Sequence, residues 1–488
     1  MAKKIAVIGS GVGGMAAAIR LQCRGYDVTL YEKNDTLGGK ISEIQLGKFR
    51  FDTGPSLFTL PHLVDELILL NEKFNIIDFS YQKLDKVTKY FYENDTFISN
   101  DNPHNWDLFS PNNKNRIVNY LQKNKLRYEL AAPIFLQNSL HSIHTYFSKY
   151  AWNALLKLHS LGIFQTMHEE NMSNFDDMRI VQLFDRYATY NGSDPYRTPA
   201  TLNIISHLEH NLGAYYPTQG MIAIRNAMSE MIKICGVVCS TGAEVSQILV
   251  NNNKVKGLIV NNIHYEYDYV VSNADICHTY RKLLPTIKAP ERILAQPKSS
   301  SAMIFHWGVQ GTHPDLELHN ILFTDNYKSE FEHIRQGNIY SKPTIYIYIS
   351  SKVKKDDAPA GCENWFVMIN VPHDQGQDWH MLAQNAKENV VKIINKRLNI
   401  NIEDRIIAEQ IRTPLHIAQE TGAYLGALYG NSSNNMFSAF LRHANYSTDI
   451  KGLYFCGGSV HPGGGIPLCL YSAQIVDKLI WSYDKSKS

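Results

Sequence analysis

Three glycines and one acid near the N-terminus have the types and spacing that can hold a nucleotide phosphate. Gly9, Gly11 and Gly14 form a GxGxxG pattern, and Glu32 follows 23 residues after Gly9. In such a pattern the first glycine permits a tight turn, the second lets main chain approach a pyrophosphate, and the third lets a helix pack closely on a strand. The carboxylate of Glu32 can accept hydrogen bonds from a ribose and would repel a 2′-phosphate. The pattern therefore predicts a dinucleotide site.

A second glycine-rich segment lies near the C-terminus. The stretch FCGGSVHPGGGIPLCLYSAQ (455–474) has five glycines within nine positions, after a strand-like run and before a helical one. Glycine is tolerated where main chain must approach another group closely, and it weakens regular elements elsewhere. We therefore predict that this segment contacts a ligand through its backbone. The alternative is a glycine-rich surface loop.

The residues around the N-terminal glycines predict the strand-helix-strand unit that a dinucleotide site needs. We expect an apolar strand at 5–8, an alanine-rich helix at 15–21 that stops at Gly25, and a second strand at 28–31. The helix N-terminus would face the phosphate charge. A secretory signal peptide is the alternative interpretation of the basic start and apolar run, but three glycines interrupt the apolar part.

The rest of the chain reads as a mixture of helices and strands. Residues 64–206 read as mostly helical and aromatic, and 215–232 include a second apolar helix. Three strands are expected within 242–275, with a hairpin turn at the NNN tract (251–253), and further strands at 301–310 and 344–351.

Composition excludes several classes of protein. A chain of 488 residues is long enough for two or three domains. Its net charge of +2 gives no strong field, so nucleic acid is not expected as a partner. Seven cysteines without a CxxC pair argue for a reducing compartment and against structural zinc, so we expect no metal. No uncharged apolar run reaches the ~18 residues of a membrane-spanning helix.

Blocks spread over nearly the whole chain resemble the bacterial-type phytoene desaturase family of carotenoid and retinoid oxidoreductases. They are the N-terminal fingerprint, FDTGPS, RYATYNGSDPYRTPA, HLEHNLGAYYPTQGM, VVSNAD and YFCGGSVHPGGGIPLCLYSAQ, of which the last is the most specific. The resemblance implies an α/β fold with a Rossmann-like, split FAD-binding domain, as in glutathione reductase and amine oxidases. That domain would comprise 1–72, 213–292 and 415–488. An α+β substrate domain with a helical, membrane-contacting part would comprise 73–212 and 293–414.

The same resemblance implies which residues hold FAD. The C-terminal glycine segment would lie beneath the flavin and its ribityl chain, and Asn273 would lie at a strand end near the cofactor. Val245 would meet the adenine through its backbone, or it is simple strand core. The full predicted set is Gly9, Gly11, Val12, Gly13, Gly14, Glu32, Lys33, Gly39, Lys40, Gly54, Pro55, Ser56, Val245, Asn273, Gly457, Gly458, Gly465, Ile466 and Pro467.

The chain has no catalytic constellation of the hydrolytic kinds. We find no Ser-His-Asp order, no HExxH and no defensible carboxylate pair. A flavin-dependent desaturase of this family would instead pass a hydride to the flavin and a proton to a weak base. The candidate for that base is Glu209 in HLEHNLGAYYP, where an apolar cavity would raise its pKa. The alternative for Glu209 is a structural ion pair or a cap at a helix end.

Residues 54–61, GPSLFTLP, resemble the 1-hydroxycarotenoid 3,4-desaturase branch of the family more than the phytoene-acting branch, which tends to read GPSWYWMP. The resemblance thus implies a carotenoid substrate, with oxygen or a quinone as terminal electron acceptor. Four alternatives stay open at this point: a phytoene desaturase, a flavin-linked carotenoid isomerase, an amine oxidase, and a non-enzymatic prenyl-lipid binding protein of GDI-like fold.

A water-insoluble polyene must enter and leave through lipid, so a membrane surface is an expected partner. The segment Leu130–Met167 combines apolar, aromatic, basic and histidine residues, as an interfacial helix does. Trp152 and Phe147 are its proposed anchors. An ordinary buried helix pair is the alternative. The expected location is the cytoplasm, with peripheral association to the inner membrane.

Overall fold

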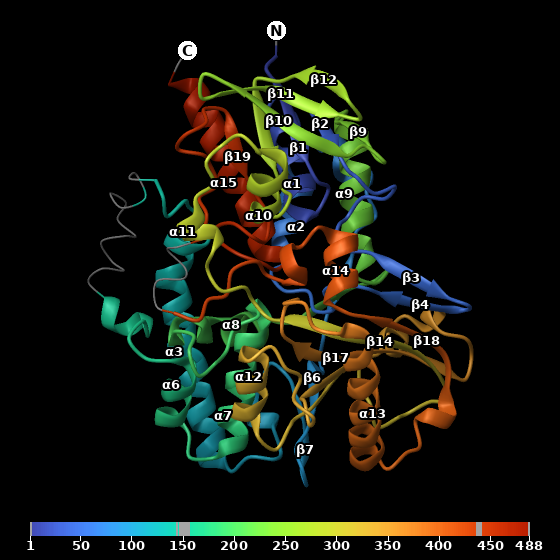
Figure 1. Cartoon of the computed structure of the whole chain (residues 1–488). Helices are drawn as coiled ribbons and strands as arrows, with labels where there is room; N and C mark the ends of the chain where they lie inside the picture. Colours follow the sequence, from blue (N-terminus) through green and yellow to red (C-terminus); the bar gives the residue numbers. More distant parts are fainter. Residues whose placement is uncertain (1, 143–144, 146–156, 436–441, 487–488) are drawn as a thin grey trace.

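The computed structural model describes residues 2–142, 145, 157–435 and 442–486. Figure 1 shows two stacked halves, an upper one around a parallel sheet and a lower one around a larger mixed sheet. The chain has the α/β fold that the sequence predicted. Within the described ranges, no helix has the length and apolar character needed to cross a bilayer.

The upper sheet joins strands from three distant parts of the chain. Its order is β19-β13-β1-β2-β9, and every neighbouring pair is parallel. Its core strands are apolar because a parallel sheet is covered on both faces. The strands are β1 (Lys4–Ile8), β2 (Asp27–Tyr31), β9 (Val238–Ser240), β13 (Tyr269–Ser272) and β19 (Leu453–Phe455). The N-terminal, middle and C-terminal segments therefore meet in one sheet.

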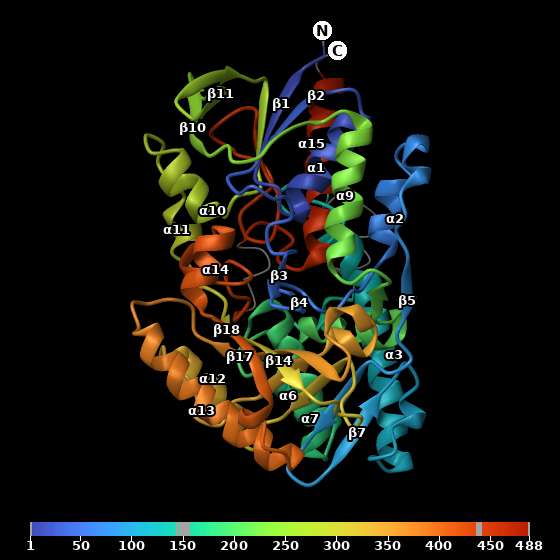
Figure 2. The ribbon, with the colours of Figure 1, turned by 90° about the vertical axis from the view of Figure 1, so that its right-hand side faces the viewer.

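Helices and a small antiparallel sheet cover the two faces of this parallel sheet. On one face lie α1 (Val12–Cys23), α9 (Ile222–Cys235) and α15 (Ile466–Lys485), which Figure 2 shows side by side. On the other face lie β10 (Val245–Asn251), β11 (Lys254–Val260) and β12 (Ile263–Glu266). The predicted helix begins earlier than expected, at Val12, because Gly11 is its N-cap.

The region expected to hold three strands holds four, β10 to β13. The NNN tract forms the predicted turn between β10 and β11, and there Asn252 and Asn253 have positive φ angles of 49° and 55°. Asparagine tolerates this left-handed conformation better than most residues.

The lower sheet has the order β18-β14-β17-β16-β15-β6-β7. Its outer face packs on α13 (Trp379–Leu398) in one apolar core, while the alternate residues of the same strands face inward. The strands are β6 (Thr88–Phe91), β7 (Thr96–Ser99), β14 (Ser301–Gln310), β15 (His319–Leu322), β16 (Ile345–Tyr348), β17 (Cys362–Val371) and β18 (Ile406–Arg412).

The expectation that 64–206 is mostly helical is wrong in part. β6 and β7 lie in that region, and β6 pairs in parallel with β15, more than 200 residues later. Such pairing depends on tertiary contacts that local propensity does not report. The main helices of the region are α2 (His62–Ile68), α3 (Pro111–Phe135), α6 (Met167–Asn174), α7 (Met178–Asp185) and α8 (Ile204–His207).

Short elements complete the fold and connect the halves. They are β3 (Glu43–Leu46), β4 (Phe49–Asp52), β5 (Tyr81–Lys83), β8 (Tyr215–Pro217), α10 (Ile276–His278), α11 (Glu291–Leu294), α12 (Tyr327–Arg335) and α14 (Pro414–Thr421). The predicted domain boundaries, at 72, 212, 292 and 414, stay a prediction.

Candidate active site

A cavity of about 750 Å³ connects the two halves of the molecule. It begins at the carboxyl ends of β1 and β2, where Gly9 and Glu32 line it, and it continues to the inner face of the lower sheet, where Ile304, Tyr346 and Met368 line it. Ligands of open α/β sheets bind beyond the carboxyl ends of the strands. The cavity thus joins a nucleotide-type site to a second, more apolar chamber.

Glu32 is held in place by the turn that follows β1. Its Oε2 accepts hydrogen bonds from the backbone N of Ser10 at 2.8 Å and from Ser10 Oγ at 2.6 Å, and its Oε1 accepts one from the backbone N of Asn34 at 3.0 Å. The buried carboxylate still lines the cavity. Its position at the end of β2 is the one that ribose recognition requires.

Two predicted glycines form the floor beneath the cavity and do not line it. A Cβ atom on Gly14 would lie 2.0 Å from the carbonyl oxygen of Gly9, so only glycine lets α1 pack this closely on β1. A Cβ atom on Gly457 would lie 2.4 Å from Asn273 Oδ1. Asn273 itself donates a hydrogen bond from Nδ2 to Gly9 O at 3.2 Å and lines the cavity.

The C-terminal glycine segment reaches the same cavity from the other side. Gly458, Gly465, Ile466 and Pro467 line it, and Gly465 is the N-cap of α15. Gly465 has φ +109°, and a Cβ atom there would meet nothing within 4 Å. The backbone is therefore bare toward the cavity. The N-termini of both α1 and α15 border one space, and each favours negative charge.

The other predicted cofactor residues also lie on the cavity wall. Lys40 is half-buried, its Nζ donates to the carbonyl of Leu428, and loss of solvation lowers its pKa. Lys33 is exposed and donates to Gln419 O at 3.0 Å. The remaining wall positions from the predicted set are Gly11, Val12, Gly13, Gly39, Gly54, Pro55, Ser56 and Val245.

Glu209 lies behind the cavity in a dense polar cluster. It is 0% exposed, and its Oε1 accepts from Arg186 Nη2 at 2.6 Å and from Tyr187 OH at 2.8 Å. Its Oε2 accepts from Tyr190 OH at 2.5 Å. Burial alone would raise the pKa of Glu209, but the Arg186 charge and these hydrogen bonds bring it below its usual range. The expected rise in pKa is therefore wrong, because the sequence did not show that Arg186 pairs with this carboxylate.

Most side chains that face the second chamber are neutral and polar or apolar, and the charged Arg186, which also lines the cavity, is paired with Glu209. Ser56 Oγ and Tyr346 OH lie 2.6 Å apart, and Tyr346 OH lies 2.8 Å from Nδ1 of His319. Burial lowers the pKa of His319 to about 4, so its imidazole is neutral at physiological pH. This wall suits an uncharged, largely apolar molecule.

The sequence matches the model of the family described as flavin-containing amine oxidoreductase over residues 12–309. The chain belongs to this flavin-containing amine oxidoreductase family. It is 48% identical to the 1-hydroxycarotenoid 3,4-desaturase of a Flavobacterium strain, over 98% of this chain and 99% of that protein. It is 29% identical to the 4,4'-diapolycopene oxygenase of a Methylomonas species, over 98% of each chain.

Solved structures share the fold of this family at low sequence identity. Putrescine oxidase bound to putrescine is 14% identical, with a TM-score of 0.65 over 99% of each chain. Cyclohexylamine oxidase from Brevibacterium oxydans is 13% identical, with a TM-score of 0.64 over 99% of this chain and 100% of that one. The protein is an oxidoreductase, and its cofactor is FAD. The bare glycine backbone, the two helix N-termini and the Glu32 carboxylate all fit that cofactor.

One loop of the FAD-side wall was not predicted from the sequence. Gly422, Leu428, Tyr429 and Gly430 line the cavity, and Gly426 lies between them in the chain. Gly422, Gly426 and Gly430 have φ angles of 70°, 67° and 69°. Glycine at every fourth position was the available signal, because a regular helix or strand disfavours it.

Proposed function

We propose that the protein is an FAD-dependent desaturase that converts the 3,4 single bond of an acyclic 1-hydroxycarotenoid end into a double bond. The observation that carries the proposal is the 48% identity, across nearly the full length of both chains, to the Flavobacterium 1-hydroxycarotenoid 3,4-desaturase. The apolar chamber supports it, because a polyene needs a wall such as Ile304, Ile321 and Met368 provide.

FAD, held by the bare glycine backbone, the two helix N-termini and Glu32, would supply the hydride acceptor. The apolar wall of the second chamber would hold the polyene and exclude water from it. Loss of a hydride next to a polyene leaves a cation that is spread over many atoms, so the neighbouring proton leaves to a weak base. Ser56 and Tyr346 border the chamber with hydroxyl groups that hydrogen-bond each other. Both groups are neutral, and they add no charge to the chamber.

The substrate assignment predicts a clear order of turnover. We expect purified protein with bound FAD to convert a 1-hydroxycarotenoid to a product that absorbs at longer wavelength and weighs one H₂ less per desaturated end. Phytoene should react poorly, because its short triene delocalises less charge. Absorption and mass spectra of a carotenoid panel measure this. Conversion of phytoene to lycopene at the rate seen with 1-hydroxycarotenoids would replace the proposal with a phytoene desaturase.

We infer that oxygen or a quinone reoxidises the flavin. The same assay, run without oxygen and with or without an added quinone, distinguishes the two acceptors. If turnover continued without oxygen and without an added quinone, neither would be the electron acceptor.

We also infer that the protein works at the surface of a membrane, as a peripheral protein on the cytoplasmic side of the inner membrane. The proposed anchors Phe147 and Trp152 lie outside the described residues. Within the same predicted segment, Phe164 is described, and it is 72% exposed. A large exposed aromatic side chain is typical of a surface that contacts lipid.

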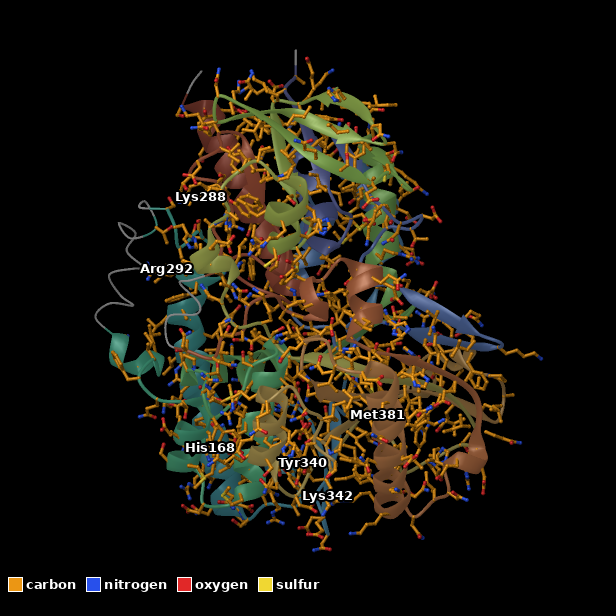
Figure 3. The ribbon with its side chains drawn as sticks, in the orientation of Figure 1. His168, Lys288, Arg292, Tyr340, Lys342 and Met381 are labelled. Carbon is orange, nitrogen blue, oxygen red and sulfur yellow. The ribbon has the colours of Figure 1, made fainter. Side chains whose placement is uncertain are left out.

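The membrane inference predicts that Phe164→Glu weakens binding to liposomes. A charge at this position has to be desolvated when the segment enters the interface. Met381→Glu is the matched control, since Met381 is 52% exposed on α13. Figure 3 shows Met381 on the opposite side of the lower half from His168, which follows the segment closely in sequence. In flotation, Phe164→Glu should remain in the aqueous fraction more than wild type and Met381→Glu. Equal flotation of all three would remove this segment from the proposed membrane surface.

A further inference from the structure

Part of the wall of the second chamber is polar, and this part, at Tyr327, Thr344 and Asn370, is called here its polar end. Ile304 and Met368 are neighbours on the paired strands β14 and β17. The next pair of inward-facing neighbours along these strands is Ala302 and Asn370. Asn370 lines the cavity together with Thr344 and Tyr327. Thr344 immediately precedes β16 and ends the connection from α12, on which Figure 3 labels Tyr340 and Lys342 in the lower half of the molecule.

A buried carboxylate stands directly behind this end. Glu330, on α12, is 0% exposed. Its Oε2 accepts from the backbone N of Thr344 at 3.1 Å and from Thr344 Oγ1 at 2.7 Å. No donor among the described residues reaches its Oε1 at hydrogen-bond geometry. Buried polar atoms without a partner are rare in folded proteins, and the Asn370 side chain is the donor close enough to lower the pKa of this carboxylate.

Charge at this end is small. Burial raises the pKa of Glu330 to about 7, although Thr344 and Asn370 act in the opposite direction. The nearby ring of Tyr327 lines the cavity, and its hydroxyl pKa is raised by burial. The chamber therefore ends in hydrogen-bonding groups that are neutral or only partly charged, in contrast to the apolar wall before them.

We propose that Thr344 and Asn370, backed by Glu330, form the receptor for the tertiary hydroxyl group of the substrate. A hydroxyl group donates one hydrogen bond and accepts up to two. The Asn370 amide has two N–H donors, and since hydrogen bonding to Glu330 engages at most one of them, the other can donate to the substrate. Thr344 Oγ1 uses its own hydrogen on Glu330 and accepts from the backbone N of Thr324 at 3.4 Å, so a second lone pair is available to accept from the substrate.

This receptor rests on the proposed function and explains how the enzyme would choose among carotenoid ends. A hydrocarbon end would exclude water from Thr344 and Asn370 without replacing its hydrogen bonds, which favours the hydroxylated end by roughly ten- to a hundredfold. Ser56, Tyr346 and His319 form the other polar chain on this wall. Both of its hydroxyl groups already bond within the chain, while the Nε2 atom of His319 has no partner among the described residues. A substrate hydroxyl that bound to His319 instead would leave the preference unchanged in the Thr344 and Asn370 variants.

The test measures kcat/KM of the FAD-loaded protein for a 1-hydroxylated end and for the matching end without the hydroxyl group. Thr344→Val and Asn370→Leu keep the approximate size of the side chains and remove the hydrogen bonds. Each should lower kcat/KM for the hydroxylated end at least tenfold and leave kcat/KM for the hydrocarbon end within about threefold of wild type. The ratio of the two kcat/KM values should therefore fall toward one. Thr324→Val is the matched control, because Thr324 is buried beside Thr344 but does not line the cavity. It should keep the wild-type preference.

The wild-type protein gives an independent measurement that no folding defect can obscure. Methylation of the substrate hydroxyl removes its donor, and kcat/KM for the 1-methoxy compound should fall at least tenfold. An unchanged preference in the folded variants, or equal turnover of the hydroxy and methoxy compounds, would overturn the receptor and leave the desaturase standing. Failure of wild type to desaturate any 1-hydroxycarotenoid would overturn the proposed function and the receptor together.

Discussion

Gly11→Val should yield a folded protein that purifies without its yellow colour. Gly11 has an ordinary φ of −59°, so valine is compatible with its backbone. A Cβ atom there would lie 2.8 Å from Asn273 Nδ2, and the branched side chain would occupy the approach to the N-terminus of α1. A side chain in that approach would overpack against the bound cofactor, and about 1–3 kcal/mol of such overpacking corresponds to roughly five- to more than a hundredfold in affinity for FAD. The bound flavin per protein, read from its visible absorption, measures the loss, and activity should fall with it.

Two further variants separate loss of cofactor from loss of stability. Gly25 follows the same helix at φ +93°, and a Cβ atom added there would meet nothing within 4 Å. Gly25→Val should therefore destabilise the fold by about 1–3 kcal/mol through backbone strain yet retain flavin. Gly465 has φ +109°, so Gly465→Val carries the same kind of backbone strain as Gly25→Val, but its side chain is added toward the cavity, and it should lose flavin as Gly11→Val does. A full flavin spectrum in the Gly11→Val protein would show that the N-terminal glycines do not hold FAD.

Glu209→Ala should destabilise the protein by about 3–5 kcal/mol, because it leaves the buried guanidinium of Arg186 without its carboxylate partner. Arg186 also lies against the rings of Tyr187 and Tyr190, with 4.5 Å and 5.4 Å from its Cζ to the ring centroids. The cluster stabilises the short helical segment Arg186–Asn191, which lines the chamber. Chemical unfolding, followed by fluorescence in the presence of excess FAD, measures the change.

An exposed ion pair provides the control for this effect. Glu291 pairs with Arg281 at 2.6 Å on the surface, and Glu291→Ala should leave the unfolding midpoint almost unchanged because solvent screens such pairs. The double variant Arg186→Met with Glu209→Gln should lose less stability than the two single changes added together. Glu209→Gln with full stability and full flavin but a much lower kcat would instead show that the Glu209 carboxylate takes part in turnover and not only in the stability of the fold.

The sequence alone determined the nucleotide half of the site, because there the signals are local. A run of apolar residues, three glycines at fixed spacing and an acid at the end of the next strand lie within 32 consecutive residues. Their geometry follows from the backbone demands of one turn and one helix N-terminus. The C-terminal glycines are equally local, and the structure brings Gly458 and Gly465 to the cavity that Gly11 borders. The family resemblance supplied FAD and the substrate class.

Only the tertiary structure decided the second chamber, because its residues meet through contacts that sequence spacing does not report. Glu209 looked like a base in an apolar setting, and its pairing with Arg186 reverses the direction of its pKa. Glu330 has the pattern of a surface residue in YKSEFEHIR, yet α12 turns it onto Thr344, and burial then raises its pKa. The charge state and reach of a side chain depend on the groups that fold around it from distant segments. Periodicity shows which side of a helix is apolar, but the three-dimensional fold decides what that side meets.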